Sequence, residues 1–195
     1  MANSQMPAES EILDYVRSLS NWGRWGEDDQ LGTINHIGSD QRKQAAALVQ
    51  DGVAVSCARP ITTDTAPDVG SPPLHYMTGA GEGYAISDEA LPQPGQGSGD
   101  FIGMRFHGYS ITHLDSLCHI FWNGRMYNGR PSAMVTTSEG ATANSIEVAQ
   151  DGVVSRGVLL DAARHRGVNW LEPGEAITPD ELKEIEAEQG TRVQQ

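Results

Sequence analysis

The sequence predicts a mixed fold of helices and strands, α/β or α+β, with more loop than either kind of element. Short apolar runs bounded by Gly or Pro are typical of buried strands, and apolar residues repeating every three or four positions are typical of amphipathic helices. Both patterns occur here. The 22 glycines and 10 prolines indicate many turns and long loops. At 195 residues, we expect a single domain over residues 1–195.

The N-terminal part opens with a predicted helix over residues 8–19, where apolar side chains repeat at helical spacing. Ser39 is expected to cap a second helix over residues 40–50. The run Val53–Ala58 is short, partly β-branched and closed by Pro60, so it predicts a strand.

The middle of the chain is poor in periodic pattern. Residues 62–100 carry much of the glycine and proline, which predicts a long loop within the domain. Compact domains seldom keep such a loop without a use, so we expect it to fold over a site or to mediate oligomer contacts. Residues 101–106 predict a strand that leads into His107.

The C-terminal part alternates again between helix and strand. Thr142 is expected to cap a helix to about residue 150, and residues 157–162 predict a buried strand. The run Thr178-Pro179-Asp180-Glu181 is a capping box with proline at the first helical position. The helix that it opens is expected to run to residue 189, where Gly190 ends it.

Composition excludes several function classes. The net charge of -13 disfavours binding to nucleic acid or to an anionic membrane surface, because both would repel the chain. No apolar run has the length of a membrane span, and the first residues lack the order of a signal peptide. The two cysteines, Cys57 and Cys118, form no Cys-x-x-Cys pair. We therefore expect a reduced, cytoplasmic protein.

Three of the six histidines fall within thirteen residues, around an aspartate: His107, His113, Asp115 and His119. All four positions are odd-numbered, so an extended segment would point their side chains to one face. Two imidazoles and a carboxylate on one surface suit Zn, Mn or Fe. The spacing therefore predicts a metal site.

These residues resemble the signature of the metal-dependent cyclase/hydrolase family that includes bacterial kynurenine formamidase and isatin hydrolase, namely His-x-Gly-Thr-His-x-Asp-x-Pro-x-His. Thr112, His113, Asp115 and His119 match it. Further matches, to a branch of larger bacterial members, are Asn21–Gly26, Leu31–Asn35, Phe121–Gly129 and Ser155–Asp161.

The match to the signature has two departures. Tyr109 stands where the family has its first histidine, and His107 lies two residues earlier. Leu117 replaces the proline. Members of this branch are longer, and their second pair of metal ligands, a His and a Glu, would follow residue 195. The resemblance thus implies the N-terminal portion of such an enzyme.

The resemblance implies a swivelling β/β/α fold with a central barrel-like sheet, usually assembled as a homo-oligomer. It also implies a divalent metal, Zn or Mn, held by His113, Asp115 and His107, with His119 as the catalytic acid and base. The reaction implied is hydrolysis of an amide bond in a small aromatic substrate. That substrate would be an aryl formamide or cyclic amide, N-formylkynurenine being the example from tryptophan catabolism.

Two tryptophans in the polar loop Asn21–Gly26 need a surface on which to bury their rings. They are expected either to cover the core or to form an aromatic wall for a flat substrate. Because a tryptophan near the N-terminus contacts substrate in the family, Trp25 and Trp22 are candidate substrate-binding residues, with Trp25 the better one.

Two alternatives remain open. His113 and Asp115 with a distant His165 would make the two-histidine, one-carboxylate triad of a non-haem iron oxygenase. A chain without the second pair of ligands would instead be a catalytically incomplete fragment or a small-molecule binding relic.

Overall fold

The computed structural model describes residues 7–84 and 95–194. The chain divides into two bodies, each with its own internal contacts. The first body is Met1–Gly52 together with Ser116–Gln195, and the second body is Val53–Asp115. Among the described residues, no helix is long and apolar enough to cross a membrane.

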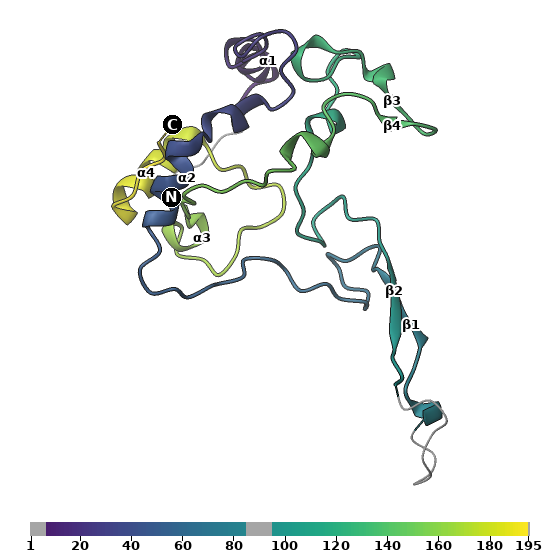
Figure 1. Ribbon diagram of the computed structural model, residues 1–195. Helices are drawn as coiled ribbons and strands as arrows, with labels where there is room; N and C mark the ends of the chain where they lie inside the picture. Colours follow the sequence, from purple (N-terminus) through teal and green to yellow (C-terminus); the bar gives the residue numbers. More distant parts are fainter. Residues whose placement is uncertain (1–6, 85–94, 195) are drawn as a thin grey trace. The chain divides into compact units, whose positions relative to one another are not determined.

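The first body holds all four α-helices of the described residues and one short hairpin (Figure 1). Short 3-10 helices connect them, among them Gly32–His36, Leu117–His119 and Ile146–Ala149. The regular elements are α1 Glu9–Ser18, α2 Ser39–Ala47, β3 Val135–Thr136, β4 Gly140–Ala141, α3 Ala162–His165 and α4 Pro179–Gln189.

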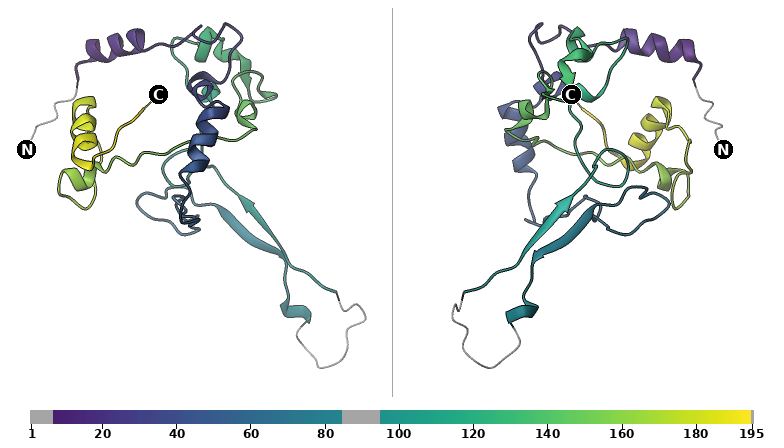
Figure 2. Two further views of the ribbon diagram at one scale, coloured as in Figure 1. Left: turned by 60° about the vertical axis from the view of Figure 1, so that its left-hand side comes forward. Right: turned by 90° about the vertical axis from the view of Figure 1, so that its right-hand side faces the viewer.

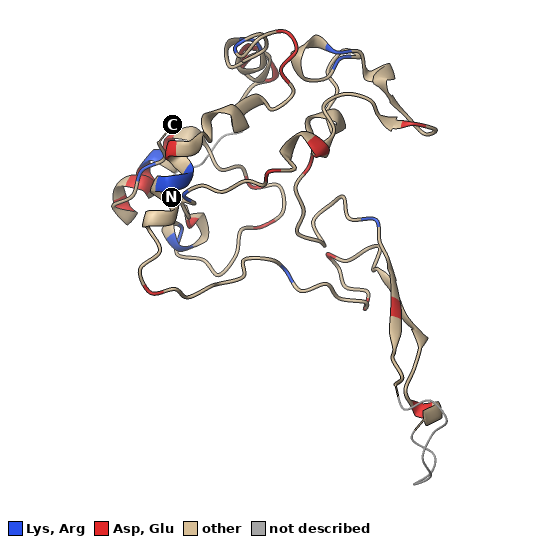
Figure 3. Ribbon diagram, viewed as in Figure 1, with Lys and Arg blue, Asp and Glu red and all other residues tan. Residues whose placement is uncertain are grey.

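The best-determined prediction from sequence is α4. The Thr178 side chain accepts a hydrogen bond from the Glu181 amide at 3.3 Å, and Pro179 stands at the first helical position. Gly190 ends the helix in the left-handed region, with φ of 62°, which glycine adopts without steric cost. Acidic residues gather on this helix (Figure 3).

The other predicted helices agree less closely with the structure, mainly at their ends. Helix α1 agrees with residues 8–19 to within a residue or two, whereas α2 is capped by Gly38 and not by Ser39. The predicted helix after Thr142 is a single 3-10 turn, Ile146–Ala149. The Thr142 hydroxyl donates to the Met134 carbonyl at 3.0 Å instead of capping a helix.

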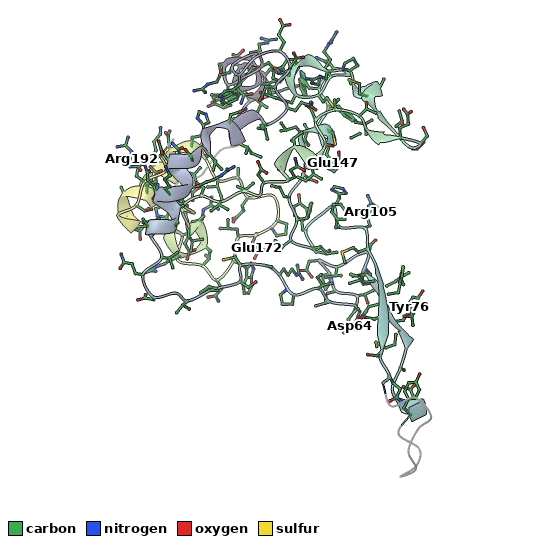
Figure 4. All side chains as sticks on the ribbon, viewed as in Figure 1. Asp64, Tyr76, Arg105, Glu147, Glu172 and Arg192 are labelled. Atoms are coloured by element: carbon green, nitrogen blue, oxygen red, sulfur yellow. The ribbon has the colours of Figure 1, made fainter. Side chains whose placement is uncertain are left out.

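The second body contains the other hairpin, β1 Leu74–Gly79 and β2 Gly99–Gly103, whose strands run antiparallel (Figure 2). Tyr76, labelled in Figure 4, pairs with Phe101, and their ring centroids lie 5.1 Å apart. Strand β2 covers the first part of the strand predicted over 101–106, but β1 lies inside the predicted 62–100 loop. Residues 85–94 of that loop lie outside the described residues.

Two predicted strands are absent from the described residues. The runs 53–58 and 157–162 belong to no strand, and Val53 and Leu159 are 76% and 79% exposed. A strand needs a partner for its backbone hydrogen bonds, and neither run has one among the residues described. Both sheets of the described residues are two-stranded, so the expected barrel-like sheet is not formed by them. The mixed helix and strand content itself is confirmed.

A small buried cluster organises the first body. Cys118, Met126 and Ala143 are its centre, and the β3–β4 hairpin packs against it. Cys118 is buried, and its amide donates to the Asn144 carbonyl at 3.1 Å. The segment that follows Asp115 is therefore anchored in this core.

Candidate metal centre

The four residues His107, His113, Asp115 and His119, here called the histidine row, begin in the loop that follows β2. Arg105, labelled in Figure 4, lies in this loop two residues before His107. Gly108 has φ of 121°, a conformation that side chains disfavour, and it turns the chain after His107. The loop then brings His107 back to Asp115, with Nδ1 of the histidine 2.8 Å from Oδ1 of the aspartate.

His113 faces the same carboxylate. Its Nδ1 lies 2.7 Å from the Ile111 carbonyl oxygen, which can only accept, so Nδ1 carries the proton. Nε2, the nitrogen left to bind a metal, lies 3.6 Å from Oδ1 of Asp115. A backbone carbonyl that fixes the tautomer in this way is the usual support of a metal-binding histidine.

Aromatic packing holds the two imidazoles. The Phe106 ring lies 4.4 Å from the His107 ring and 5.6 Å from the His113 ring, centroid to centroid. The two imidazoles themselves meet edge to face at 5.3 Å. This packing limits the rotation of both histidine side chains next to the Asp115 carboxylate.

A second set of contacts fixes the loop backbone at Ser110 and Thr112, between His107 and His113. The Arg59 amide donates to the Thr112 hydroxyl at 2.8 Å, and the Arg59 guanidinium pairs with Asp68 at 2.8 Å. The Ser110 hydroxyl donates to the Asp68 carbonyl at 2.9 Å. Ile111 is buried between these contacts. The threonine of the signature thus has a structural role.

His107, His113 and Asp115 do meet, but the prediction that a shared strand face brings them together is wrong. Residues 104–116 form no strand, so a shared strand face does not align them. The loop folds back on itself instead. Tyr109, at the signature's first histidine position, is 96% exposed, whereas His107 reaches the carboxylate.

The donor atoms fit a divalent metal. Two ligands about 2.1 Å from one ion, at a tetrahedral or octahedral angle, lie roughly 3.0–3.4 Å apart. The 3.6 Å between His113 and Asp115 is close to that value. The 2.8 Å between His107 and Asp115 is a direct hydrogen bond that would open by a few tenths of an ångström. Both histidines and the carboxylate are types of ligand that Zn and Mn accept.

His119 lies in the first body, at the end of the 3-10 helix Leu117–His119, and is exposed. It follows Asp115 by four positions, which limits the distance between their Cα atoms to about 14 Å. His107, Asp115 and His119 are a set of exposed residues of the right types to share a metal ion. His113 is not in that set, so two assignments of the second imidazole compete.

The tryptophan loop is in the first body too. Trp25 meets the edge of the His36 ring at 5.2 Å, and the Arg24 guanidinium lies 5.1 Å above the Trp25 ring. Trp22 lies against Gly129, where an added Cβ would be 3.6 Å from its ring. Both rings thus have structural contacts, and Trp22 still exposes 46% of its surface.

Sequence reasoning missed the residue that holds this loop. The Asn128 side chain donates to the carbonyls of Gly26, Glu27 and Asp29 at 2.8, 3.1 and 3.1 Å. Its Oδ1 accepts from the Gly23 amide at 2.7 Å. The signal was present, because the asparagine falls in one matched segment and its partners fall in or beside another.

The Asp29 carboxylate and the Tyr127 phenol also connect the region near the tryptophan loop with the segment Phe121–Gly129. Asp29 accepts hydrogen bonds from the Tyr127 hydroxyl at 2.8 Å, the Gly32 amide at 2.9 Å and the Asn35 amide at 2.7 Å. Burial alone would raise the pKa of Asp29, but these hydrogen bonds outweigh it and the pKa is lowered. Burial, and then the bond to Asp29, raises the pKa of Tyr127 to about 12.

His165 is engaged elsewhere in the first body. Its Nδ1 lies 2.6 Å from the Glu188 carboxylate and its Nε2 3.7 Å from the Glu184 carboxylate, both on α4. Both ring nitrogens thus face acidic side chains, which gives the oxygenase triad no support.

The comparisons with known proteins agree with the family resemblance found in the sequence. Residues 60–195 match the Cyclase family, described as "Putative cyclase". The chain belongs to this family. A solved structure described as the crystal structure of a novel cyclase is 35% identical, with a TM-score of 0.79. That match covers 90% of this chain and 59% of the other, so the cyclase chain described here spans less than two thirds of its solved relative. No curated protein matches.

Proposed function

We propose that this cyclase-family chain binds a divalent metal, Zn or Mn, through its histidine row and serves the hydrolysis of an amide bond. The substrate class is an aryl formamide or cyclic aryl amide, of which N-formylkynurenine is the example. The observation that carries the proposal is the convergence of His107 and His113 on Asp115, with one histidine tautomer fixed by the Ile111 carbonyl. Membership of the Cyclase family supports an enzymatic role.

When bound, the metal would polarise the amide carbonyl and acidify water. Asp115 supplies the negative charge that holds the cation, and His107 supplies a neutral imidazole nitrogen beside it. His119 is proposed to accept a proton from the attacking water and to return it to the leaving nitrogen. Trp25 and Trp22 are proposed to present their rings to the aromatic part of the substrate.

The second candidate is a chain that binds metal or ligand without turnover. It is favoured by one observation, namely that the chain spans 59% of the solved cyclase that it matches. The swivelling β/β/α arrangement, the homo-oligomer and the residues that complete the ligand set remain proposals for the same reason.

Elemental analysis of the purified chain tests the metal site. The wild type should carry close to one Zn or Mn per chain, and the His107→Ala/Asp115→Ala variant should carry none. The matched control is His75→Ala/Asp100→Ala, which removes a second exposed His–Asp pair, also 2.8 Å apart, from the hairpin. Equal metal loss in both double variants, or none in either, would contradict the proposed site.

Two single variants decide between the competing imidazoles. If His113 is a ligand, His113→Ala should weaken metal binding about as much as His107→Ala does. If His119 is the ligand, His119→Ala should do so instead. Metal retained in His119→Ala with hydrolysis of N-formylkynurenine lost would support its role as acid and base. Full metal loading without hydrolysis in the wild type would favour the binding candidate.

A further inference from the structure

Arg59 and Asp68 hold the loop of the histidine row from a distant part of the sequence. The Arg59 amide donates to the Thr112 hydroxyl at 2.8 Å, across 53 positions of the chain. Nη1 of the Arg59 guanidinium lies 3.5 Å from the Tyr109 carbonyl oxygen. The Asp68 carbonyl accepts from the Ser110 hydroxyl at 2.9 Å. The same two residues thus anchor the loop at three positions.

An ion pair joins the two anchoring residues to each other. Nη2 of Arg59 lies 2.8 Å from Oδ2 of Asp68. The backbone beside Asp68 is held as well, because the Val69 amide donates to the Ala66 carbonyl at 2.9 Å in a tight turn and Val69 is buried. The three anchors therefore form one connected set of contacts.

The Ile111 carbonyl lies between two of these anchors. Ser110 and Thr112, the neighbours of Ile111 in sequence, are both held, and the Ile111 side chain is buried. Because the backbone has only two soft dihedral angles per residue, fixing both neighbours and the side chain limits how far this carbonyl can turn. Its oxygen is the group that lies 2.7 Å from Nδ1 of His113.

The direction of this carbonyl decides which nitrogen of His113 is available to a metal. A carbonyl oxygen can only accept, so Nδ1 carries a proton and Nε2 is left on the side of Asp115. Loss of such a partner of a metal-binding histidine typically lowers metal affinity by about 10–100-fold. Here the partner is a backbone carbonyl, which no substitution removes, so its position depends on the residues that anchor it.

The Arg59–Asp68 ion pair contributes more to geometry than to stability. The two side chains are 37% and 58% exposed, and an exposed ion pair adds little to the free energy of unfolding. The planar guanidinium, with its donors in a fixed fork, is suited to holding a carboxylate and a carbonyl at set positions. A loss of positioning should therefore be measurable apart from a loss of folding.

We infer that Arg59 and Asp68 are positioning residues of the metal site, which hold the Ile111 carbonyl against His113 and so present Nε2 of that histidine to the metal. The inference rests on the proposed function, because it requires that the histidine row bind Zn or Mn. It also assigns the second imidazole of the site to His113. All of the residues that carry it belong to the second body.

The first measurement is the metal affinity of the full 195-residue chain, from titration of the metal-free protein with Zn and with Mn. Arg59→Ala should weaken binding about tenfold, at the lower end of the range for direct partners of a ligand. Its midpoint of urea unfolding should stay close to that of the wild type. Arg17→Ala is the matched control, because it removes another exposed Arg–Asp pair, with Asp14, from the first body and should change neither quantity.

Two variants at Thr112 test the same route without touching the ion pair. Thr112→Val removes the hydroxyl that accepts from the Arg59 amide, whereas Thr112→Ser keeps it. Both should fold, because Thr112 is exposed. Thr112→Val should weaken metal binding about tenfold, and Thr112→Ser should stay within about threefold of the wild type.

The ring tautomer of His113 in the metal-free chain is a measurement that a merely structural role would not change. In mildly alkaline solution an ordinary imidazole carries one ring proton, and the nitrogen chemical shifts of the ring show which nitrogen holds it. The wild type should have the proton on Nδ1, as the Ile111 carbonyl requires. Arg59→Ala and Thr112→Val should each give a mixture with more of the proton on Nε2, and Thr112→Ser should resemble the wild type.

Four results would overturn the inference and leave the proposed function standing. These are an unchanged metal affinity in Arg59→Ala, equal weakening by Arg59→Ala and Arg17→Ala, affinity lost only together with folding, and a His113 tautomer that neither loop variant changes. A wild type that binds no metal would instead overturn the proposed function, and the inference with it. The wild-type titration therefore separates the two kinds of failure.

Discussion

Replacement of Tyr127 by phenylalanine removes one hydroxyl group and leaves the ring in place. That hydroxyl donates to Asp29 at 2.8 Å, and the Tyr127 side chain is only 9% exposed. A hydrogen bond to a charged group contributes about 1.5–3 kcal/mol to stability. Tyr127→Phe should therefore lower the free energy of unfolding of the first body by about 2 kcal/mol at pH 7.

The pH dependence of this loss has a definite sign. The pKa of Asp29 is lowered from 3.8 in the folded chain, so its contribution is present above that pH and is lost as pH falls through the folded pKa. The pKa of Tyr127 is raised, so its contribution is present below pH 10.0 and is lost as pH rises toward 12. The difference between wild type and Tyr127→Phe should be greatest between these limits and shrink on both sides.

Urea unfolding followed by tryptophan fluorescence measures this difference, because Trp22 and Trp25 lie in the loop that Tyr127 helps to hold. Tyr76→Phe is the control, since Tyr76 is 55% exposed in the other body and should cost no more than about 0.5 kcal/mol. A loss below 0.5 kcal/mol for Tyr127→Phe, or a difference that is constant from pH 3 to pH 11, would refute the reasoning.

Three further predictions concern other contacts. Asn128→Ala removes four hydrogen bonds to the loop 23–29 and should cost about 2–4 kcal/mol in urea unfolding; a cost equal to that of an exposed substitution would contradict this. Glu188→Gln removes the carboxylate that, more than any other cause, raises the pKa of His165, so the NMR titration midpoint of His165 should fall. The stability contributed by the pair, full below pH 6.5 and lost as pH rises through the folded pKa, should fall with it. Zn or Mn at a hundred times its dissociation constant should stabilise the second body by about 2.7 kcal/mol, and a chelator should reverse this; an unchanged melting temperature would argue against the site.

What could be predicted from the sequence depended on how local its cause is. Helix α4 was predicted end to end, because the Thr178 cap, Pro179 and the left-handed Gly190 act within a turn of the helix they bound. The runs 53–58 and 157–162 have the composition of strands but form none among the described residues, because a strand also requires a partner elsewhere in the chain. The amino-acid composition of a run indicates whether it can form a strand, but it does not indicate whether a pairing partner exists.

The histidine row was predicted by residue type and spacing, but for the wrong geometric reason. Alternation on a strand would have placed His107, His113 and Asp115 on one face; instead Gly108 turns the loop and Arg59 anchors it at Thr112. The contacts of Arg59 with Thr112 and of Asp68 with Ser110 join residues more than forty positions apart. A pattern within thirteen residues could not indicate them.

Some of the segments that match the family hold the architecture together, whereas others contain the proposed metal ligands. Only the second kind supports a function for this chain. Asn21–Gly26, Leu31–Asn35 and Phe121–Gly129 hold one another through Asn128, Asp29 and Tyr127. A likeness over these segments therefore follows from shared architecture and would persist in relatives with different substrates. In the histidine row, His107 and Asp115 are exposed, and an exposed ion pair contributes little to stability. The chemistry proposed for the chain thus depends on the histidine row, and the choice of substrate on the residues that border it.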